Sequence, residues 1–505
     1  MAELSLRELL ELGLATSVVG DAEVRVRGIR HDSRRCEPGD LFVAVAGAQS
    51  DGAQFIADAV KRGAVAVLAE RAITETVPVL VADDALVSLS AIAQRLYDDP
   101  TAGMPGVGVT GTNGKTTCTY LIESLLLAAK QTPAVLGTVN FRGPWGELPA
   151  THTTPMADDV MRLAQRARTA GVSHLVLEVS SHGLAMHRVD CVHFAVAAFT
   201  NLTQDHLDYH GDFASYEAAK RRLFRELAPN NAVVNVDDPV GRAIADEFQA
   251  QNKGRVLRCS KVAAPEHDVC VVASESSRAG IRARVRCAGE EFELESPLLG
   301  EHNVENLLVA LGCGAALGLP VDVMQRALET ARGAPGRLQR VEHPHDVLIF
   351  VDYAHTPDAL ARVLKTLRAE TTGRLLVTFG CGGDRDPIKR PIMGRYSAEL
   401  ADVVVLTTDN PRSEAPARIL EQIEAGVTGL PKLTAPELAR AARGYCVEAD
   451  RAAAIRSIVG AAQPGDTVLI AGKGHEKVQI IGAQRLPFDD VQVAEQVVAG
   501  LARGG

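Results

Sequence analysis

A short polar motif in the first half of the chain has the residue types that bind the phosphates of a nucleotide. Residues 110–117 read Thr-Gly-Thr-Asn-Gly-Lys-Thr-Thr, after an apolar run and before a helical pattern. Glycines let backbone N–H groups approach phosphates closely, and a helix N-terminus favours negative charge. Lys115 can reach the β- and γ-phosphates, and the Thr116 hydroxyl suits Mg²⁺. Val109 stands where the general phosphate loop has glycine, so the motif predicts a variant of that loop.

Further polar residues in this half of the chain suggest a cation site. Glu178 ends an apolar run, where an uncompensated charge is costly, so either a metal ion or a structural salt bridge is expected there. His206 and His210 have a zinc-like spacing but lack the intervening glutamate of a metalloprotease helix. A single histidine on Mg²⁺, or plain core packing, explains them better. Lys220 lies on a helical stretch, and its sequence alone indicates a solvated lysine.

A second group of polar residues, near the C-terminus, could recognise the two charged ends of an amino acid. Residues 409–412 read Asp-Asn-Pro-Arg and have the composition of a β-turn. The planar guanidinium of Arg412 suits a carboxylate, and Glu476 could hold an ammonium. Together they predict an amino-acid site, with an ordinary turn as the alternative for each motif taken alone.

Apolar runs of strand length precede most of these loops. The runs are residues 24–29, 41–45, 64–68, 77–81, 107–110, 174–179, 195–200, 232–236, 347–351, 374–379, 402–406 and 466–470. Residues 116–130 have the pattern of a helix with a buried leucine face. This alternation predicts a doubly wound α/β fold, whose ligands bind beyond the carboxyl ends of the strands.

Length and composition exclude several classes of protein. A chain of 505 residues predicts about three domains at ~150 residues each, and we place them at residues 1–100, 101–335 and 336–505. The apolar content of 46% argues against disorder, and the net charge of −10 argues against a general nucleic-acid surface. No run approaches the ~18 apolar residues of a membrane span. The N-terminus lacks the core of a signal peptide, and nine scattered cysteines indicate reduced thiols. A cytoplasmic protein is expected.

Together the motifs resemble those of the Mur ligases and the related folylpolyglutamate synthetases. That family also carries valine at the unusual position of the phosphate loop. Residues 32–34 and 38–44 are similar to its uridine-nucleotide domain, and the resemblance covers essentially the whole chain. Further family motifs follow in order at residues 153–155, 178–182, 205–208, 302–306, 336–337 and 352–355. The resemblance implies three α/β domains: an N-terminal uridine-nucleotide-binding domain, a central P-loop-type ATPase domain with a parallel sheet, and a C-terminal Rossmann-like domain for the amino acid.

Within the family, residues 409–412 resemble those of members that use meso-2,6-diaminopimelate. The resemblance implies an ATP-dependent ligase that adds this amino acid to UDP-N-acetylmuramoyl-L-alanyl-D-glutamate through an acyl phosphate, in cytoplasmic peptidoglycan precursor synthesis. Arg412 would bind the distal carboxylate that L-lysine lacks. The same ligase with L-lysine is the closest alternative, and an ATP-driven switch or motor is another. Folylpolyglutamate synthesis would leave the N-terminal domain unexplained.

The resemblance also implies roles for individual residues. Catalysis is expected from Lys115, Lys220 and His206, with Lys220 carboxylated. The expected ATP contacts are Gly111, Thr112, Asn113, Gly114, Lys115, Thr116, Thr117, Asn306, Arg337 and Asp352. The expected Mg²⁺ ligands are Thr116, Glu178, His206 and Lys220. The expected contacts of the UDP substrate are His31, Ser33, Gln49, Thr153, Thr154, Ser180 and Arg188. Those of diaminopimelate are Arg385, Asp409, Asn410, Pro411, Arg412, Gly472 and Glu476.

Several positions depart from the family pattern, and one role stays open. The departures are His31, Ala48, His152 and Met186, and each weakens the inference that its own side chain contacts the substrate. His355 is a candidate base for the amine proton, because a histidine at a strand end can titrate near neutrality; packing against the linker is an equal alternative. Small-molecule substrates are the only expected partners, with no nucleic acid, no membrane insertion and a monomeric chain.

Overall fold

The computed structural model of the chain describes residues 2–45, 51–203, 205, 207–227 and 229–504. Three residues that the sequence analysis singled out lie outside this description. They are Gln49, an expected substrate contact, Ala48, a departure from the family pattern, and His206, an expected metal ligand. Two compact units make up the chain. One comprises Met1–Val272, Val285–Phe292 and Glu305–Leu328, and the other comprises Ala273–Arg284, Glu293–Val304 and Glu329–Gly505.

The first unit begins with a five-stranded sheet. Its strands, in sheet order, are β2 (Ser17–Val19), β7 (Val79–Val81), β6 (Ala66–Ala69), β5 (Asp40–Val43) and β4 (Gly28–Arg30). The helical elements here are α1 (Leu6–Glu11), η1 (Ser33–Arg35), η2 (Gly52–Phe55), α2 (Ile56–Lys61) and α3 (Ala85–Leu96). The strands expected at residues 41–45, 64–68 and 77–81 are confirmed.

The single strand expected at residues 24–29 is wrong, because the chain changes partner within it. β3 (Arg25–Val26) pairs with β1 (Leu4–Ser5), whereas β4 pairs with β5. Between them, Arg27 donates two hydrogen bonds to the Pro38 carbonyl, at 2.8 and 2.6 Å. An apolar run fixes the strand tendency of a segment but not the neighbour with which it pairs.

An 11-stranded sheet follows. Its order is β11 (Gly146–Pro149), β10 (Asn140–Gly143), β9 (Pro133–Leu136), β12 (His174–Glu178), β8 (Gly106–Thr110), β13 (Phe194–Phe199), β14 (Asn231–Asn235), β15 (Arg255–Ser260), β16 (Val269–Ser277), β17 (Gly280–Cys287) and β18 (Glu290–Ser296). The strands from β9 to β16 are parallel. The helices are α4 (Lys115–Ala128), α5 (Ala157–Thr169), α6 (Ser181–Ala185), α7 (Leu207–His210), α8 (Phe213–Arg225), α9 (Pro239–Ala250), α10 (Glu301–Ala316) and α11 (Val321–Thr330).

The central strands carry apolar residues on both faces, as parallel strands covered by helices require. Val107 and Val109 of β8 and Leu175 of β12 are fully buried. All four strands expected in this region are confirmed, and α4 confirms the helix expected at residues 116–130. Leu121, on its inner face, is also fully buried.

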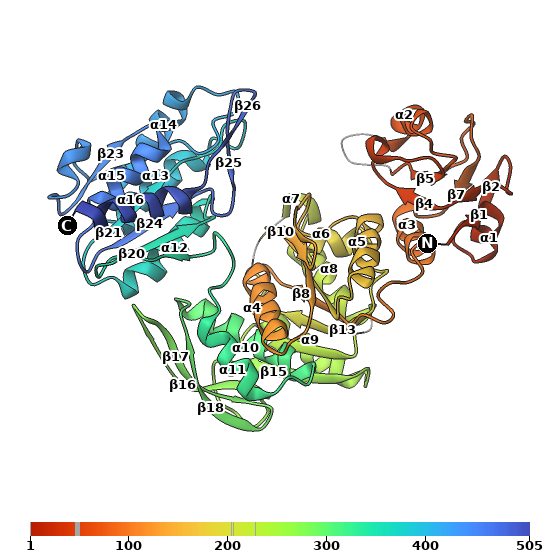
Figure 1. Cartoon of the computed structure of the whole chain (residues 1–505), viewed down its shortest axis with the longest axis horizontal. Coiled ribbons are helices and arrows are strands. Elements are labelled where there is room, and N and C mark those ends of the chain that lie inside the picture. Colours follow the sequence, from red (N-terminus) through yellow and green to blue (C-terminus); the bar gives the residue numbers. More distant parts are fainter. Residues whose placement is uncertain (1, 46–50, 204, 206, 228, 505) are drawn as a thin grey trace. The chain divides into compact units, whose positions relative to one another are not determined.

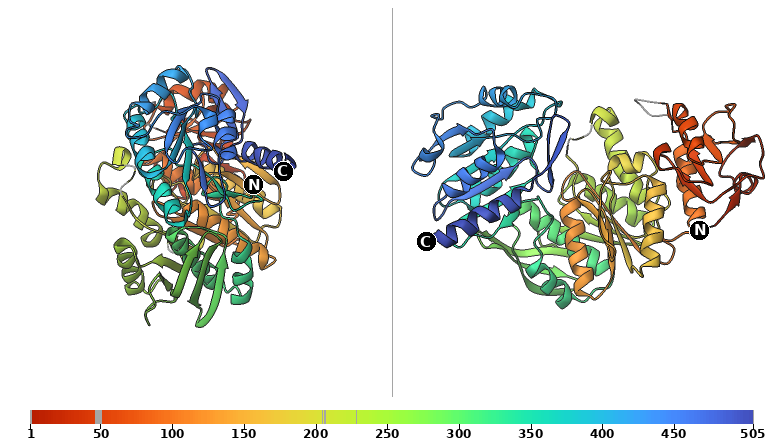
Figure 2. Two further views of the ribbon diagram at one scale, coloured as in Figure 1. Left: turned by 90° about the vertical axis from the view of Figure 1, so that its left-hand side faces the viewer. Right: turned by 45° about the horizontal axis from the view of Figure 1, so that its top comes forward.

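The second unit contains a doubly wound sheet (Figures 1 and 2). Its order is β19 (Gln339–Val341), β20 (Leu348–Asp352), β24 (Thr467–Ala471), β21 (Leu375–Phe379), β22 (Val403–Leu406) and β23 (Gly444–Val447). All neighbours are parallel except β19. One apolar core contains α12 (Pro357–Glu370), α13 (Lys389–Leu400) and α14 (Pro416–Glu424), and the other contains α15 (Arg451–Gly460) and α16 (Asp490–Gly504). Strand residues alternate between the cores: Phe350 enters the first and Ile349 the second.

A short helix and a β-hairpin complete the second unit. η3 (Ala435–Glu437) is a short 3-10 helix, and β25 (Val478–Ile481) forms a hairpin with β26 (Gln484–Pro487).

None of the described helices has both the length and the apolar character that a membrane span needs. The nine cysteines are free and buried.

Candidate functional site

The glycine-rich loop joins β8 to the N-terminus of α4, as the sequence predicts. Gly111 and Gly114 have φ angles of 142° and 88°, in the region that favours glycine. A Cβ at Gly114 would collide with the side chain of Asn306, so this predicted ATP contact lies directly against the loop. Lys115 Nζ donates to the carbonyls of Gly111 and Thr112, at 2.9 and 3.0 Å. The loop therefore has the form of a phosphate cradle, with its lysine folded over it.

Glu178 ends β12 beside this loop and is 1% exposed. Its carboxylate accepts hydrogen bonds from Thr116 Oγ1 at 2.8 Å, and from the N–H and hydroxyl of Thr138, both at 2.9 Å. In the described part of the chain it has no ion-pair partner, so the salt-bridge alternative finds no support there. Buried oxygen ligands of this kind are the ones that Mg²⁺ prefers. No group of three or more acidic, histidine or cysteine side chains suited to a metal occurs among the described residues.

Thr138 is a site residue that the sequence analysis missed. It follows β9, the neighbour of β12, and its hydroxyl also lies 3.0 Å from that of Thr153. A polar residue just beyond the carboxyl end of a parallel strand is the signal that could have identified it. The signal was weak because β9 itself was not recognised as a strand.

Lys220 is buried, which overturns its interpretation as a solvated lysine. Its Nζ donates to the Gly111 carbonyl at 2.8 Å and lies 4.7 Å from the centre of the Tyr216 ring. Burial and the nearby Lys115 hold the pKa of Lys220 well below its ordinary value. The fold of α8 against the loop, which no local pattern reveals, places this amine at the phosphate cradle.

Four residues assigned to the UDP substrate surround the backbone at the end of β12. Thr154 Oγ1 donates to the Glu178 carbonyl at 2.8 Å and lies 3.0 Å from Ser180 Oγ. Arg188 donates to the Thr154 carbonyl at 2.9 Å, and its other terminal nitrogen contacts the sulfur of Met186. The structure thus brings Thr153, Thr154, Ser180 and Arg188 together around Glu178.

The N-terminal candidates have protein partners of their own. His31 Nδ1 lies 2.8 Å from the Asp158 carboxylate, and Ser33 Oγ donates to Asp58 at 3.0 Å. Burial opposes the charged form of His31, but hydrogen bonding and attraction to Asp158 raise its pKa overall. Either side chain would have to share these partners with a substrate.

In the second unit, four loops leave the carboxyl ends of the adjacent strands β20, β24, β21 and β22. Arg385 and Arg412 both flank Gly382, where a Cβ would lie 2.9 Å from Arg412 Nη1 and 3.6 Å from Arg385 Cγ. Arg412 Nη1 donates to the Gly383 carbonyl at 2.8 Å. The Arg412 guanidinium and the aliphatic part of Arg385 thus meet at one glycine turn, and a planar guanidinium is a group that can bind a carboxylate.

The remaining diaminopimelate candidates meet at the same edge of the sheet. Asn410 Nδ2 donates to Glu476 Oε2 at 2.8 Å, and Asn410 Oδ1 accepts from the Ile480 N–H at 2.9 Å. Asp409 is buried, and burial raises the pKa of its carboxyl. Gly472 lies close to it, since a Cβ there would be 3.9 Å from the Asp409 carboxylate. Asn410 and Glu476 are thus in direct contact, and Asp409 and Gly472 lie close together at the same edge of the sheet.

Arg337 and Asp352, the other predicted nucleotide contacts, also lie in the second unit. Asp352 accepts the N–H groups of Leu338 and Ala354, at 2.7 and 2.8 Å, and burial raises its pKa. The Arg337 guanidinium lies 5.1 Å from the Tyr353 ring. His355, the candidate base, has its Nδ1 2.8 Å from the Tyr353 carbonyl, so that nitrogen carries the proton as a donor.

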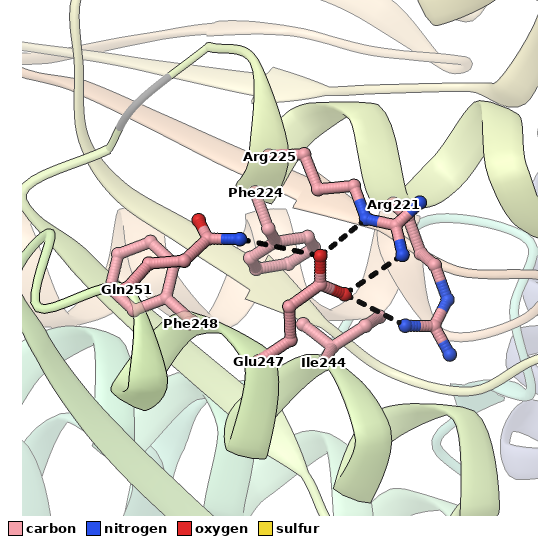
Figure 3. A pocket seen from close by; sticks show the side chains of 7 residues that line it. All are labelled: Arg221, Phe224, Arg225, Ile244, Glu247, Phe248 and Gln251. Carbon is pink, nitrogen blue, oxygen red and sulfur yellow. Dashed lines mark hydrogen bonds and ion pairs between the residues drawn. The ribbon is translucent and has the colours of Figure 1, made fainter.

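A pocket between α8 and α9 lies apart from these loops (Figure 3). Figure 3 shows Glu247 held by Arg221 and Arg225 across its floor, with Gln251 beside them. Glu247 is thus already bound by two arginines and an amide, at 2.6 to 3.3 Å. We assign no function to it.

Comparison with known proteins agrees with this arrangement. Three domain profiles match: Mur ligase family, catalytic domain, over residues 25–112; Mur ligase middle domain over 109–314; and Mur ligase, glutamate ligase domain over 336–474. The chain is 43% identical to UDP-N-acetylmuramoyl-L-alanyl-D-glutamate–2,6-diaminopimelate ligase of Synechococcus elongatus, over 94% of this chain and 95% of the relative. It is 41% identical to the protein of that name from Geobacter metallireducens, over 93% and 94%.

A solved structure of an enzyme with that name matches with a TM-score of 0.73 at 32% identity. The match covers 99% of this chain and 100% of the solved one. The α/β architecture with N-terminal, central and C-terminal domains is therefore shared. By sequence and by structure, the chain belongs to the Mur ligase family.

Proposed function

We propose that the chain is an ATP-dependent ligase that joins meso-2,6-diaminopimelate to UDP-N-acetylmuramoyl-L-alanyl-D-glutamate, in the synthesis of the peptidoglycan precursor. Relatives of that name align with nearly the whole chain. The observation that carries the substrate assignment is that Arg385 and Arg412 meet at Gly382, while Asn410, on the same loop as Arg412, holds Glu476. This set matches a distal terminus that bears both a carboxylate and an ammonium. Diaminopimelate has such a distal terminus, whereas the distal end of L-lysine carries an ammonium alone.

The phosphate loop would carry out the first step. The γ-carboxylate of the D-glutamate residue attacks the γ-phosphorus of ATP, the bond to the β-phosphate oxygen breaks, and an acyl phosphate and ADP form. Lys115 is placed to offset the negative charge on the transferring group. Thr116 and Glu178 would hold Mg²⁺, which supplies further positive charge at the phosphates. The amine of diaminopimelate then attacks the acyl carbon and forms the amide bond; the bond from that carbon to the phosphate oxygen breaks, phosphate leaves, and the amine gives up one proton.

Lys220 would act as a carbamate. Burial lowers the pKa of the Lys220 amine and so favours its neutral form, which can attack CO₂, forming a nitrogen–carbon bond and losing one proton to give an anion. That anion, together with His206, would support a second Mg²⁺ near the phosphate loop. Lys220 is buried, and among the described residues no acidic side chain lies within hydrogen-bonding distance of its amine. This combination supports the proposed carbamate.

Several finer points belong to the same proposal. The domain boundaries at residues 100 and 335, a monomeric state and a cytoplasmic location stay predictions from the sequence. The substrate contacts of His31, Ser33 and Gln49 also stay predictions.

The test is phosphate release by the purified protein with ATP, Mg²⁺ and the UDP-linked dipeptide. We expect release to depend on meso-diaminopimelate and to yield a product of the tripeptide mass. L-Lysine and a reaction without amino acid are the comparison arms. Preference for L-lysine would contradict the role of Arg412, and equal release without amino acid would favour an ATP-driven switch.

Lys220→Ala should lower kcat by about 10²-fold, because the anion near the phosphate loop is lost. Short carboxylic acids such as acetate or formate should partly restore it by occupying the space of the carbamate. Lys253→Ala removes an exposed lysine and is the matched control, with unchanged kcat expected. Wild-type rates in Lys220→Ala without added acid would contradict the carbamate.

A further inference from the structure

Lys473 is a fully buried lysine beneath the amino-acid cluster, and no role has been assigned to it above. It follows β24 in the sequence Gly-Lys-Gly, and its side chain is 0% exposed. Its ammonium lies 3.1 Å from Asn410 Oδ1, 3.1 Å from Glu476 Oε2 and 3.6 Å from Asp409 Oδ1. A buried ammonium destabilises the fold unless it is paired, and these three contacts provide that pairing.

The contacts of Lys473 leave one oxygen of Glu476 for a ligand. Oε2 accepts from both Lys473 and Asn410, whereas Oε1 has no hydrogen-bond partner among the residues that the structure describes. The Glu476 side chain is 31% exposed, so Oε1 can be reached from solvent. Burial opposes ionisation of Glu476, but Lys473 and Asn410 outweigh it and hold its pKa below the usual range.

The groups around Lys473 also fix the local charge. Two carboxylates, Asp409 and Glu476, face it, and Arg412 stands on the same loop as Asp409. The neighbouring Arg451 and Asp490 are both buried and neutralise each other, at 2.7 Å. Lys473 and Arg412 together thus offset the two carboxylates, and Arg385 at Gly382 adds one further positive charge.

We propose that Lys473 is a positioning residue that sets specificity: by offsetting one buried carboxylate, it makes the site accept a zwitterionic terminus in preference to a lone ammonium. This inference rests on the proposed function. A terminus with one ammonium and one carboxylate has no net charge, so its binding depends little on the net charge of the site. The binding of the lone distal ammonium of L-lysine depends strongly on that net charge, because a unit charge acts over a few ångströms in a partly desolvated cluster.

Lys473→Met tests the proposal, because it keeps an unbranched side chain and removes the ammonium with its charge and its hydrogen bonds to Asn410 and Glu476. We expect kcat/KM for L-lysine to rise by at least about tenfold, mainly through KM, with a change of less than about threefold for meso-diaminopimelate. Lys477→Gln is the matched control: this lysine lies four positions on, is 61% exposed and pairs with Asp489, so the preference should not change.

Two further variants separate charge from packing. Asp409→Asn is nearly isosteric and makes the site more positive, so it should raise the preference for diaminopimelate over L-lysine by about tenfold. The double variant Lys473→Met/Asp409→Asn should bring the preference back towards the wild-type value. Asp409→Asn keeps the proposal testable if Lys473→Met does not fold, which circular dichroism would show.

An unchanged preference in both single variants would overturn the inference. Wild-type protein that shows no diaminopimelate-dependent phosphate release would instead overturn the proposed function. The two failures are therefore distinguishable in one set of assays.

Discussion

Replacement of Lys115 by methionine is expected to lower kcat/KM for ATP-dependent ligation by at least about 10³-fold, because a cation that offsets the transferring phosphoryl group is worth that much. The ammonium of Lys115 has hydrogen bonds of 2.9 and 3.0 Å to loop carbonyls. Its side chain is only partly buried, so the free energy of unfolding should change little. Phosphate release and thermal melting, measured on the same preparation, would check both expectations.

Lys130→Met is the matched control, since it removes an exposed lysine just beyond the end of α4. Its kinetics should equal those of the wild type. A Lys115→Met protein that still forms the acyl phosphate at the wild-type rate would show that the loop binds nucleotide without stabilising its transfer. A large loss of stability in that variant would point to a structural role for the two loop contacts.

The sequence predicted those parts of the site in which chemistry and local structure coincide. The phosphate loop is one contiguous motif between a strand and a helix, so its shape follows from the glycines and from the helix N-terminus. Glu178 was identified because a charge at the end of an apolar strand needs compensation. The loops at residues 409–412 and 472–476 were placed together because parallel strands end at one edge of a sheet.

What the sequence could not reveal depends on contacts between distant segments. Lys220 looks like any helical lysine, and only the packing of α8 against the loop buries it. Thr138 reaches Glu178 because β9 pairs with β12, a register that no local pattern specifies. Lys473 lies between Gly472 and Glu476, both of which the sequence analysis named, yet its contacts with Asn410 and Asp409 join it to a loop more than 60 positions earlier.

The second large effect is expected at Arg412. Arg412→Leu should lower kcat/KM for meso-diaminopimelate by about 10³-fold or more, because a site built to bind a carboxylate then leaves that carboxylate unpaired. The loss for L-lysine should be much smaller, so the preference between the two amino acids should collapse. Arg418→Leu on α14 removes an exposed arginine six positions on, and it should leave both substrates unaffected.

Arg412→Leu removes the hydrogen bond from the guanidinium to the Gly383 carbonyl, but it should leave the backbone of its own loop in place. The backbone of Arg412, at φ 51°, is fixed by its own hydrogen bonds: its N–H donates to the Ile480 carbonyl at 3.1 Å, and its carbonyl accepts from the Gly482 N–H at 2.7 Å. Neither bond involves the guanidinium, so both remain in the variant. Arg412→Lys then separates charge from geometry, because lysine keeps the positive charge but lacks the planar fork. If Arg412→Lys behaves like Arg412→Leu, the selectivity depends on bidentate binding by the guanidinium. If it behaves like the wild type, the selectivity depends on the net charge of the site. In that case Lys473 is expected to affect selectivity more than the planar shape of Arg412 does.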